Sequence, residues 1–281
     1  MGYVYEYKKG SFMIAKFVRK LLYWLLSLSN KVVPIGNQVV VLALHSFSDS
    51  GWRFSIPLSK IDAMFNEYTN CGYSFINMEE FSDIIKSGKR LTGKKVLVTI
   101  DDGYKDNLKV VSVMRKYKIS PILFVTADPE RSNRAELGNS LELLNFQDIK
   151  YLKEEGWSIG CHSMTHTNIT GSSDSQLSDE VVRSKARLEE VLGEEIKYFS
   201  YPKGNSEGLC ELVKSAGYEL AFGMNDELLP GNVNLFEIPR VGLDGSHGVW
   251  ESVWAASPNS IQFRMLVKKL LSKGLIERLL K

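Results

Sequence analysis

The sequence has few cysteines, no charge excess and no low-complexity tract, and each absence excludes a class of protein. Three cysteines occur in 281 residues. An odd, widely spaced set does not form the disulfide framework of a small secreted domain, so a reducing compartment is favoured. The formal net charge of +2 gives no reason to expect nucleic acid as a partner. A composition of 44% hydrophobic and 24% charged residues is that of a globular protein with a substantial core.

The ends of the chain lack a long apolar run but are basic and amphipathic. Residues 12–28 contain an apolar run at 21–26, far short of the roughly 20 residues that span a bilayer. No small-residue cleavage site follows that run, as a signal peptide would require. A helix that packs on the domain and one that lies on a membrane surface both fit, and residues 261–281 have the same character. A bacterial cytoplasmic or membrane-associated location is favoured over export.

These patterns divide the chain into an amphipathic extension (1–36), a central domain (37–258) and a C-terminal amphipathic helix (259–281). In the central domain, strand-like and helix-like segments alternate. The expected strands are 38–47, 73–78, 95–100, 121–127, 157–163, 197–204, 218–224 and 237–245. The expected helices are 56–72, 79–88, 106–117, 145–156, 175–192 and 207–217. Expected N-terminal caps are Ser175 or Ser178 for the long helix, and Asp106 and Asn107 for the helix at 106–117.

Repeated strand–helix units joined by short loops predict a parallel sheet and an α/β fold. Seven or eight strands in one domain favour a distorted (β/α)7–8 TIM-like barrel, closed or nearly closed. No glycine-rich phosphate loop follows any strand, which excludes a dinucleotide-binding fold. In a barrel the reactive residues lie at the carboxyl ends of the strands.

Reactive residues do follow the expected strands. In the stretch "VLVTIDDGY", the strand is followed by Asp101 and Asp102. These two carboxylates repel each other unless a cation lies nearby. The segment "HSMTH" contains His162 and His166, which would share one face if it turned helically. His45 follows the first strand. Two histidines and one carboxylate form a common set of catalytic metal ligands, so these strand ends predict a metal site.

The same motifs resemble those of the polysaccharide deacetylase family, the carbohydrate esterases with a NodB-homology domain. "TIDDGY" is similar to the family's "TFDDG" motif, "HSMTH" to its His-(Ser/Thr)-x-x-His motif, and "FSYPKG" to its proline-containing third motif. "LALHSFSD" resembles the "YHxV" segment of the circularly permuted subgroup, which deacetylates exopolysaccharides such as poly-N-acetylglucosamine. The resemblance covers residues 39–245. It implies that Asp102, His162 and His166 bind a divalent metal, usually zinc, with cobalt or nickel as alternatives.

The resemblance also implies roles in proton transfer. Asp101 would be the general base, and Arg240 in "IPRV" would orient it and pair with it. His45 would be the general acid, although His247 in "LDGSH" competes for that role. Tyr201 would contribute to the oxyanion site through its backbone N–H. The implied reaction is hydrolytic removal of an N-acetyl group from a carbohydrate, with release of acetate.

Two departures from the family pattern concern the substrate groove. Ser200 stands where many members have arginine, so Arg240 must supply that charge, and Lys203 replaces a common tyrosine. Trp52, Trp250 and Trp254 could line a sugar groove, although core or surface packing is the default for a tryptophan. The expected partner is a carbohydrate with N-acetylated sugars. The alternatives are a deacylase of a lipid-linked sugar or small amide at a membrane, and an inactive glycan-binding barrel.

Overall fold

The computed structural model describes residues 18, 20–28, 38–87, 93–132, 141–169, 171–225, 227, 229 and 233–272. Most of the extension expected at 1–36, and the last nine residues of the C-terminal helix, lie outside these ranges. Residues 20–28 are helical. Among the described residues, no helix is both long enough and apolar enough to cross a bilayer.

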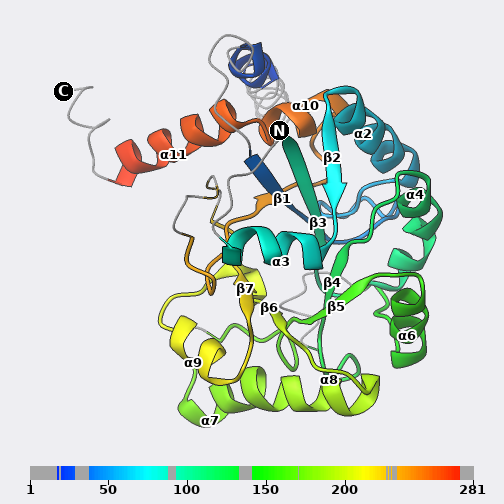
Figure 1. Ribbon diagram of the computed structural model, residues 1–281, viewed down its shortest axis with the longest axis vertical. Helices are drawn as coiled ribbons and strands as arrows, with labels where there is room; N and C mark the ends of the chain where they lie inside the picture. The colour runs from blue at the N-terminus through cyan, green and yellow to red at the C-terminus, as the bar shows by residue number, and fades with distance from the viewer. Residues whose placement is uncertain are drawn as a thin grey trace, which may run out of the picture.

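Strands and helices alternate along the chain as the sequence predicts (Figure 1). The strands are β1 (Gln38–Leu44), β2 (Tyr73–Ile76), β3 (Lys94–Ile100), β4 (Ile122–Val125), β5 (Ser158–Cys161), β6 (Tyr198–Ser200), β7 (Leu220–Phe222) and β8 (Val241–Gly242). The helices are α2 (Leu58–Asn70), α3 (Met78–Ser87), η1 (Lys105–Val110), α4 (Val111–Lys116), α6 (Phe146–Glu154), α7 (Asp174–Leu177), η2 (Ser178–Arg183), α8 (Ser184–Leu192), η3 (Pro202–Gly204), α9 (Cys210–Ser215), α10 (Val249–Ala255) and α11 (Pro258–Ser272).

All eight strands form one parallel sheet in the order β7-β6-β5-β4-β3-β1-β8, with β2 paired to the amino-terminal half of β3. The sheet curves into a half-barrel. Its two ends meet at a single parallel bridge between Phe222 of β7 and Ile238, just before β8. The expected α/β fold of the nearly closed type is therefore confirmed. The last strand is much shorter than the expected 237–245, because only Val241 and Gly242 pair with β1.

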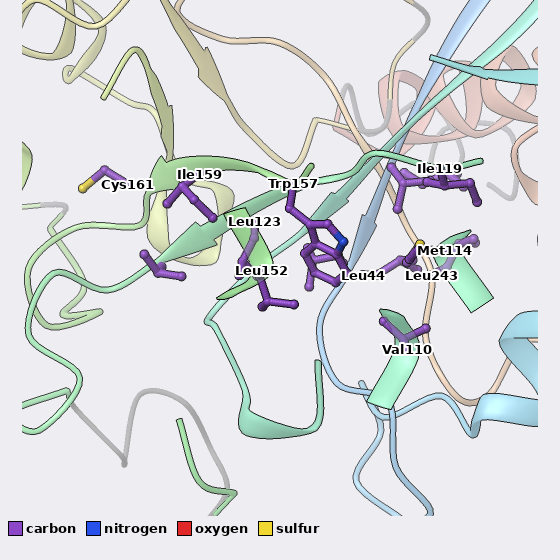
Figure 2. Close-up of a cluster of buried hydrophobic side chains, with 14 of the residues drawn as sticks. Leu44, Val110, Met114, Ile119, Leu123, Leu152, Trp157, Ile159, Cys161 and Leu243 are labelled. Carbon is purple, nitrogen blue, oxygen red and sulfur yellow. The ribbon is translucent and has the colours of Figure 1, made fainter. Parts of the chain in front are cut away.

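Alternating side chains divide the core into two layers, as the period of two in a strand requires. Val39 and Val41 of β1 and Leu97 of β3 belong to an inner cluster that includes Met78 and Phe81 of α3. Their neighbours along each strand point outward to α2, α4, α6 and α8. Figure 2 shows part of this outer cluster, where Leu44, Leu123 and Ile159 from three strands meet helix residues such as Met114 and Leu152.

Three local expectations are wrong. Asp106 and Asn107 do not cap a helix: η1 starts after Tyr104, and both side chains bond instead to the segment after β1. The long helix starts at Asp174, one residue earlier than expected, and its N-cap is Ser173 rather than Ser175 or Ser178. Its middle third, η2, is a π-helix.

Candidate metal centre and active site

Asp101 extends β3 by one residue and faces the inside of the half-barrel. Its backbone N–H donates to the Leu44 carbonyl at 2.9 Å, which continues the β1–β3 pairing. Leu97, Thr99 and Asp101 alternate along the strand, so Asp101 shares the inner side with Leu97. The next two residues, Asp102 and Gly103, have φ of 71° and 70°. This left-handed turn sends the Asp102 carboxylate in a different direction from its neighbour.

The Asp101 carboxylate is paired with Arg240 inside the protein. Arg240 donates from Nη1 to Oδ1 and from Nη2 to Oδ2, both at 2.8 Å, and neither side chain is more than 4% exposed. The remaining guanidinium N–H groups bond to Thr99 Oγ1, Ser200 Oγ and the Gly223 carbonyl. All five donors of the arginine are therefore satisfied. Ser200, which replaces the family's usual arginine, is one of the groups that hold Arg240.

This pairing determines the charge of Asp101. Burial raises the pKa of the carboxyl group, but Arg240, together with the nearby His162 and His45, outweighs burial, and the pKa lies below its ordinary value. Asp101 is consequently ionised over the physiological range and fixed in orientation by two parallel hydrogen bonds.

Asp102, His162 and His166 converge on one point. The Nε2 atoms of the two histidines each lie 3.2 Å from Asp102 Oδ1, and one ligand atom from each residue lies within 4.8 Å of the others. All three side chains are buried. Asp102 Oδ1 accepts no well-directed hydrogen bond within the described part of the chain. A buried carboxylate oxygen without a donor is unfavourable unless a cation is bound there.

Each ligand is oriented by a different feature of the fold. The His162 N–H donates to the Val125 carbonyl at 2.8 Å and extends β5. Its ring Nδ1 lies 2.8 Å from the Ser200 carbonyl. A carbonyl accepts only, so Nδ1 carries the hydrogen and Nε2 presents a lone pair to the site, as metal-ligating histidines require.

The segment from Ser163 to His166 is not helical, so the expectation that the two histidines share a helix face is wrong. Ser163 and His166 both have positive φ, at 66° and 57°. Glu180 of η2 holds this loop: it accepts from the backbone N–H groups of Met164 and Thr165 at 2.9 and 3.0 Å, and from Thr165 Oγ1 at 2.7 Å. Nothing in the sequence motifs identifies Glu180.

Backbone strain is concentrated at this site. In the described part of the chain, five non-glycine residues have positive φ, and four of them belong to the segments that line the site: Asp102, Ser163, His166 and Lys203. Each such conformation costs roughly 1–3 kcal/mol and persists only where surrounding contacts enforce it.

A cavity of about 310 Å³ opens on these residues. That volume is within the range of small-molecule pockets, about 300–1,000 Å³. It is lined by His45, Trp52, Phe54, Asp101, Asp102, His162, His166, Lys203, Gly204 and Met224. The predicted site residues His45, Asp101, Asp102, His162 and His166 therefore surround one space, with Arg240 directly behind Asp101.

His45 is held at the edge of this cavity by the two residues that were expected to be helix caps. Asn107 Nδ2 donates to the His45 carbonyl at 2.8 Å, and the Asp106 carboxylate accepts from the Phe47 N–H and the Ser46 hydroxyl. Burial lowers the pKa of His45, although the carboxylates of Asp102 and Asp101 act in the opposite sense. Its Nδ1 is buried and has no partner within the described residues.

Two predicted residues lie elsewhere. His247 does not line this cavity; its Nδ1 lies 3.0 Å from Asp244 Oδ1, and it faces an adjacent cavity. The Tyr201 N–H, expected at the oxyanion site, donates to the Phe222 carbonyl at 3.1 Å within the sheet. Its hydroxyl donates to the Phe236 carbonyl. The geometry does not support an oxyanion role for Tyr201, because its only backbone donor is used in strand pairing.

Comparison with known proteins identifies the class of protein that this fold and site define. Residues 88–221 match the family model "Polysaccharide deacetylase". The structure is similar to that of IcaB from Ammonifex degensii (TM-score 0.67, 24% identity, 80% of this chain and 98% of that one). It is also similar to the Streptococcus pyogenes deacetylase PplD (TM-score 0.66, 17% identity, 80% and 99%). At these identities the two structures establish the fold.

Two Bacillus subtilis proteins provide sequence matches. YxkH, named as a polysaccharide deacetylase, is 25% identical over 73% of each chain. The peptidoglycan-N-acetylmuramic acid deacetylase PdaA is 27% identical over 46% of each chain. Residues 88–221 therefore form a polysaccharide deacetylase domain, as the motifs predict, and the enzyme class is that of the carbohydrate esterases, which are hydrolases.

Proposed function

We propose that this chain is a metal-dependent hydrolase that removes N-acetyl groups from a carbohydrate. The observation that carries the proposal is the placement of a metal-ligand set, an arginine-paired carboxylate and a histidine around one cavity. The family match and the names of YxkH and PdaA support a glycan with N-acetylated sugars as the substrate.

The ligand set fits zinc. Two atoms that each lie about 2.0–2.1 Å from a tetrahedral zinc ion are about 3.3 Å apart, close to the 3.2 Å between Asp102 Oδ1 and either Nε2. Three protein ligands leave a coordination position open, as in catalytic rather than structural zinc sites. Cobalt or nickel would be accepted by the same donors. When bound, the ion would polarise the acetyl carbonyl and lower the pKa of a water molecule.

Side chains of the protein then carry out the proton transfers. Asp101, kept ionised by Arg240, accepts a proton from the water molecule as the water oxygen attacks the acetyl carbon. An amine leaves poorly unless it is protonated, and His45 on the cavity wall is placed to donate that proton to the sugar nitrogen. The C–N bond breaks, and the products are acetate and a sugar with a free amine.

Aromatic side chains form the wall of the cavity next to His45. The Trp52 ring lies 5.2 Å from the Phe54 ring and 5.3 Å from the Tyr104 ring, and the His45 ring lies 5.0 Å from Phe54. An apolar aromatic wall suits the C–H face of a sugar ring, while the carboxylates and histidines face its acetamido group. In this arrangement Trp52 contacts substrate rather than only packing.

An acetate-release screen tests the proposal. Metal-loaded protein is incubated with N-acetylglucosamine oligomers, partially acetylated polysaccharide and peptidoglycan fragments. We expect acetate from at least one of them, abolished by a chelator and restored by zinc. A metal-loaded protein that releases no acetate from any of these glycans contradicts the proposal and favours an inactive glycan-binding barrel.

The choice between the two candidate general acids has its own test. We expect His45→Ala to lower kcat about 10²- to 10⁴-fold, the usual contribution of a positioned proton donor, without loss of bound metal. His247→Ala is the matched control, because His247 lies outside the catalytic cavity and should retain near-normal kcat. A larger loss in His247→Ala would assign the role to His247, and equal losses would contradict the assignment to His45 alone.

A further inference from the structure

Exposed apolar side chains are concentrated on one side of the protein. Nine large hydrophobic side chains are exposed among the described residues. Seven of them lie on three elements: the N-terminal helix at 20–28 together with Val18 just before it, α10, and α11. These seven are Val18, Leu21, Trp24, Leu25 and Leu28, Trp250 of α10 and Leu266 of α11, with exposed fractions of 37–56%. Isolated exposed apolar residues are normal, but a concentration of this kind marks an interaction surface.

The helix at 20–28 presents two different faces. At 100° per residue, Val18, Leu21, Trp24, Leu25 and Leu28 fall within an arc of about 120°. The half-buried residues Leu22, Tyr23 and Leu26 lie on the opposite arc. The Tyr23 ring is covered by the Arg264 guanidinium of α11 at 5.4 Å. The helix therefore contacts α11 through Tyr23, and the apolar side chains of the other arc are exposed.

Among the described residues of the helix at 20–28, α10 and α11, the exposed charges have one sign. Lys20 and Lys269 are exposed on the same two helices. The sequence contains no acidic residue from 7 to 48 or from 252 to 276. The nearest acid on α10, Glu251, is 2% exposed. An isologous contact with a second copy of this chain would bring these lysines against each other without an opposing charge.

We propose that this surface, called the docking face below, binds an anionic phospholipid membrane. An exposed apolar arc flanked by cations is typical of helices that lie in the plane of a membrane interface. Trp24 and Trp250 are the side-chain type that prefers the boundary between lipid and water. Lysines beside the arc add attraction to anionic headgroups.

The helix that carries the outer part of the docking face borders a cavity next to the catalytic one through its opposite face. Tyr23 and Arg264 line a second cavity of about 290 Å³, which shares His45, Phe54 and Met224 with the catalytic one. Resting on the function proposed above, membrane binding would place the site next to glycans attached to a lipid or assembled at the membrane surface. Such substrates would be deacetylated faster than the same sugars free in solution.

Vesicle flotation with the full chain tests the docking face. We expect binding to vesicles of phosphatidylcholine mixed with phosphatidylglycerol, weaker binding to phosphatidylcholine alone, and weakening with added salt. A Leu21→Glu, Leu25→Glu double variant should bind at least tenfold more weakly, since two apolar side chains no longer enter the interface. Both positions are exposed, so the thermal unfolding midpoint should not change.

The matched control replaces the two exposed apolar residues outside the docking face. Tyr151 and Val182 are 43% and 40% exposed, and a Tyr151→Glu, Val182→Glu variant should bind vesicles like the unaltered protein. An Asp102→Asn variant should also bind normally, which separates docking from catalysis. Failure of the unaltered protein to bind the mixed vesicles would overturn the proposal. So would a dimer that the Leu21→Glu, Leu25→Glu variant abolishes, because a second copy would then cover this face.

Discussion

The Asp101–Arg240 pair shows how one residue's surroundings define its chemistry. A buried ion pair is favourable only when its geometry is good and its remaining hydrogen bonds are satisfied. Arg240 meets both conditions, with two bonds to Asp101 and one each to Thr99, Ser200 and the Gly223 carbonyl. The pair therefore keeps a base ionised in a place where burial alone would protonate it.

Replacing Arg240 should change both the pH profile and stability. In Arg240→Met, the largest influence that opposes burial would be lost, so the Asp101 pKa should rise and the acidic limb of kcat/KM should move to higher pH. Leaving one partner of a buried pair uncompensated costs about 3–5 kcal/mol. Arg240→Lys keeps the charge but not the paired bonds, and should show a smaller shift.

The sign of the stability effect follows from the same pKa. The Asp101 pKa is depressed in the folded protein, so the pair stabilises the fold above the unfolded pKa of about 3.9. That contribution is lost as the pH falls through the folded pKa. Denaturant titrations of the unaltered protein and of Arg240→Met, carried from pH 7 to well below the unfolded pKa, measure it. An Arg240→Met variant with an unshifted acidic limb would contradict the role given to Asp101.

For single residues, the sequence predicted most of the site residues but not the residues that hold them in position. His45, Asp101, Asp102, His162 and His166 were identifiable because each is reactive and follows a strand. Ser200 and Asp106 were missed in their roles, since a hydroxyl that holds an arginine and a carboxylate that holds a backbone loop resemble ordinary serine and aspartate. The Tyr201 N–H donates to the Phe222 carbonyl because of the strand register, and the motif gives no information about that register.

At the scale of elements, the π-helix η2 holds the loop that contains His166. Helices of this kind are rare and frequently occur at functional sites. Glu180 lies within η2, is 8% exposed, and accepts three hydrogen bonds from the loop before His166. The sequence predicted one long helix that ends at residue 192, as observed, but its apolar period did not indicate the π-helical segment.

Glu180→Gln should weaken metal binding without unfolding the protein. The amide has one acceptor oxygen where the carboxylate has two, so part of the loop loses its partner and His166 is held less firmly. We expect about 10- to 100-fold weaker zinc affinity, measured by competition with a chromogenic chelator. Asp179→Asn, at a neighbouring and exposed position, is the control and should bind zinc normally. Unchanged affinity in Glu180→Gln would show that the loop holds its shape without this carboxylate.

At the scale of the whole molecule, parallel strands bring distant segments of the chain to one place. β1, β3 and β5 end at His45, Asp101 and His162, and the sheet order sets these strand ends close together. The alternation of strands and helices was sufficient to predict this convergence. It was not sufficient to predict how the barrel closes, because the bridge between Phe222 and Ile238 involves only one residue from each segment.

In the proposed mechanism the two adjacent aspartates have separate roles: Asp101 accepts a proton, and Asp102 binds the metal. Metal content and acetate release, measured on the same preparations of three proteins, test this assignment most directly. We expect that the unaltered chain binds about one zinc and releases acetate, that Asp101→Asn binds zinc but releases none, and that Asp102→Asn does neither. Acetate release by metal-free Asp102→Asn, or full activity in Asp101→Asn, would contradict it.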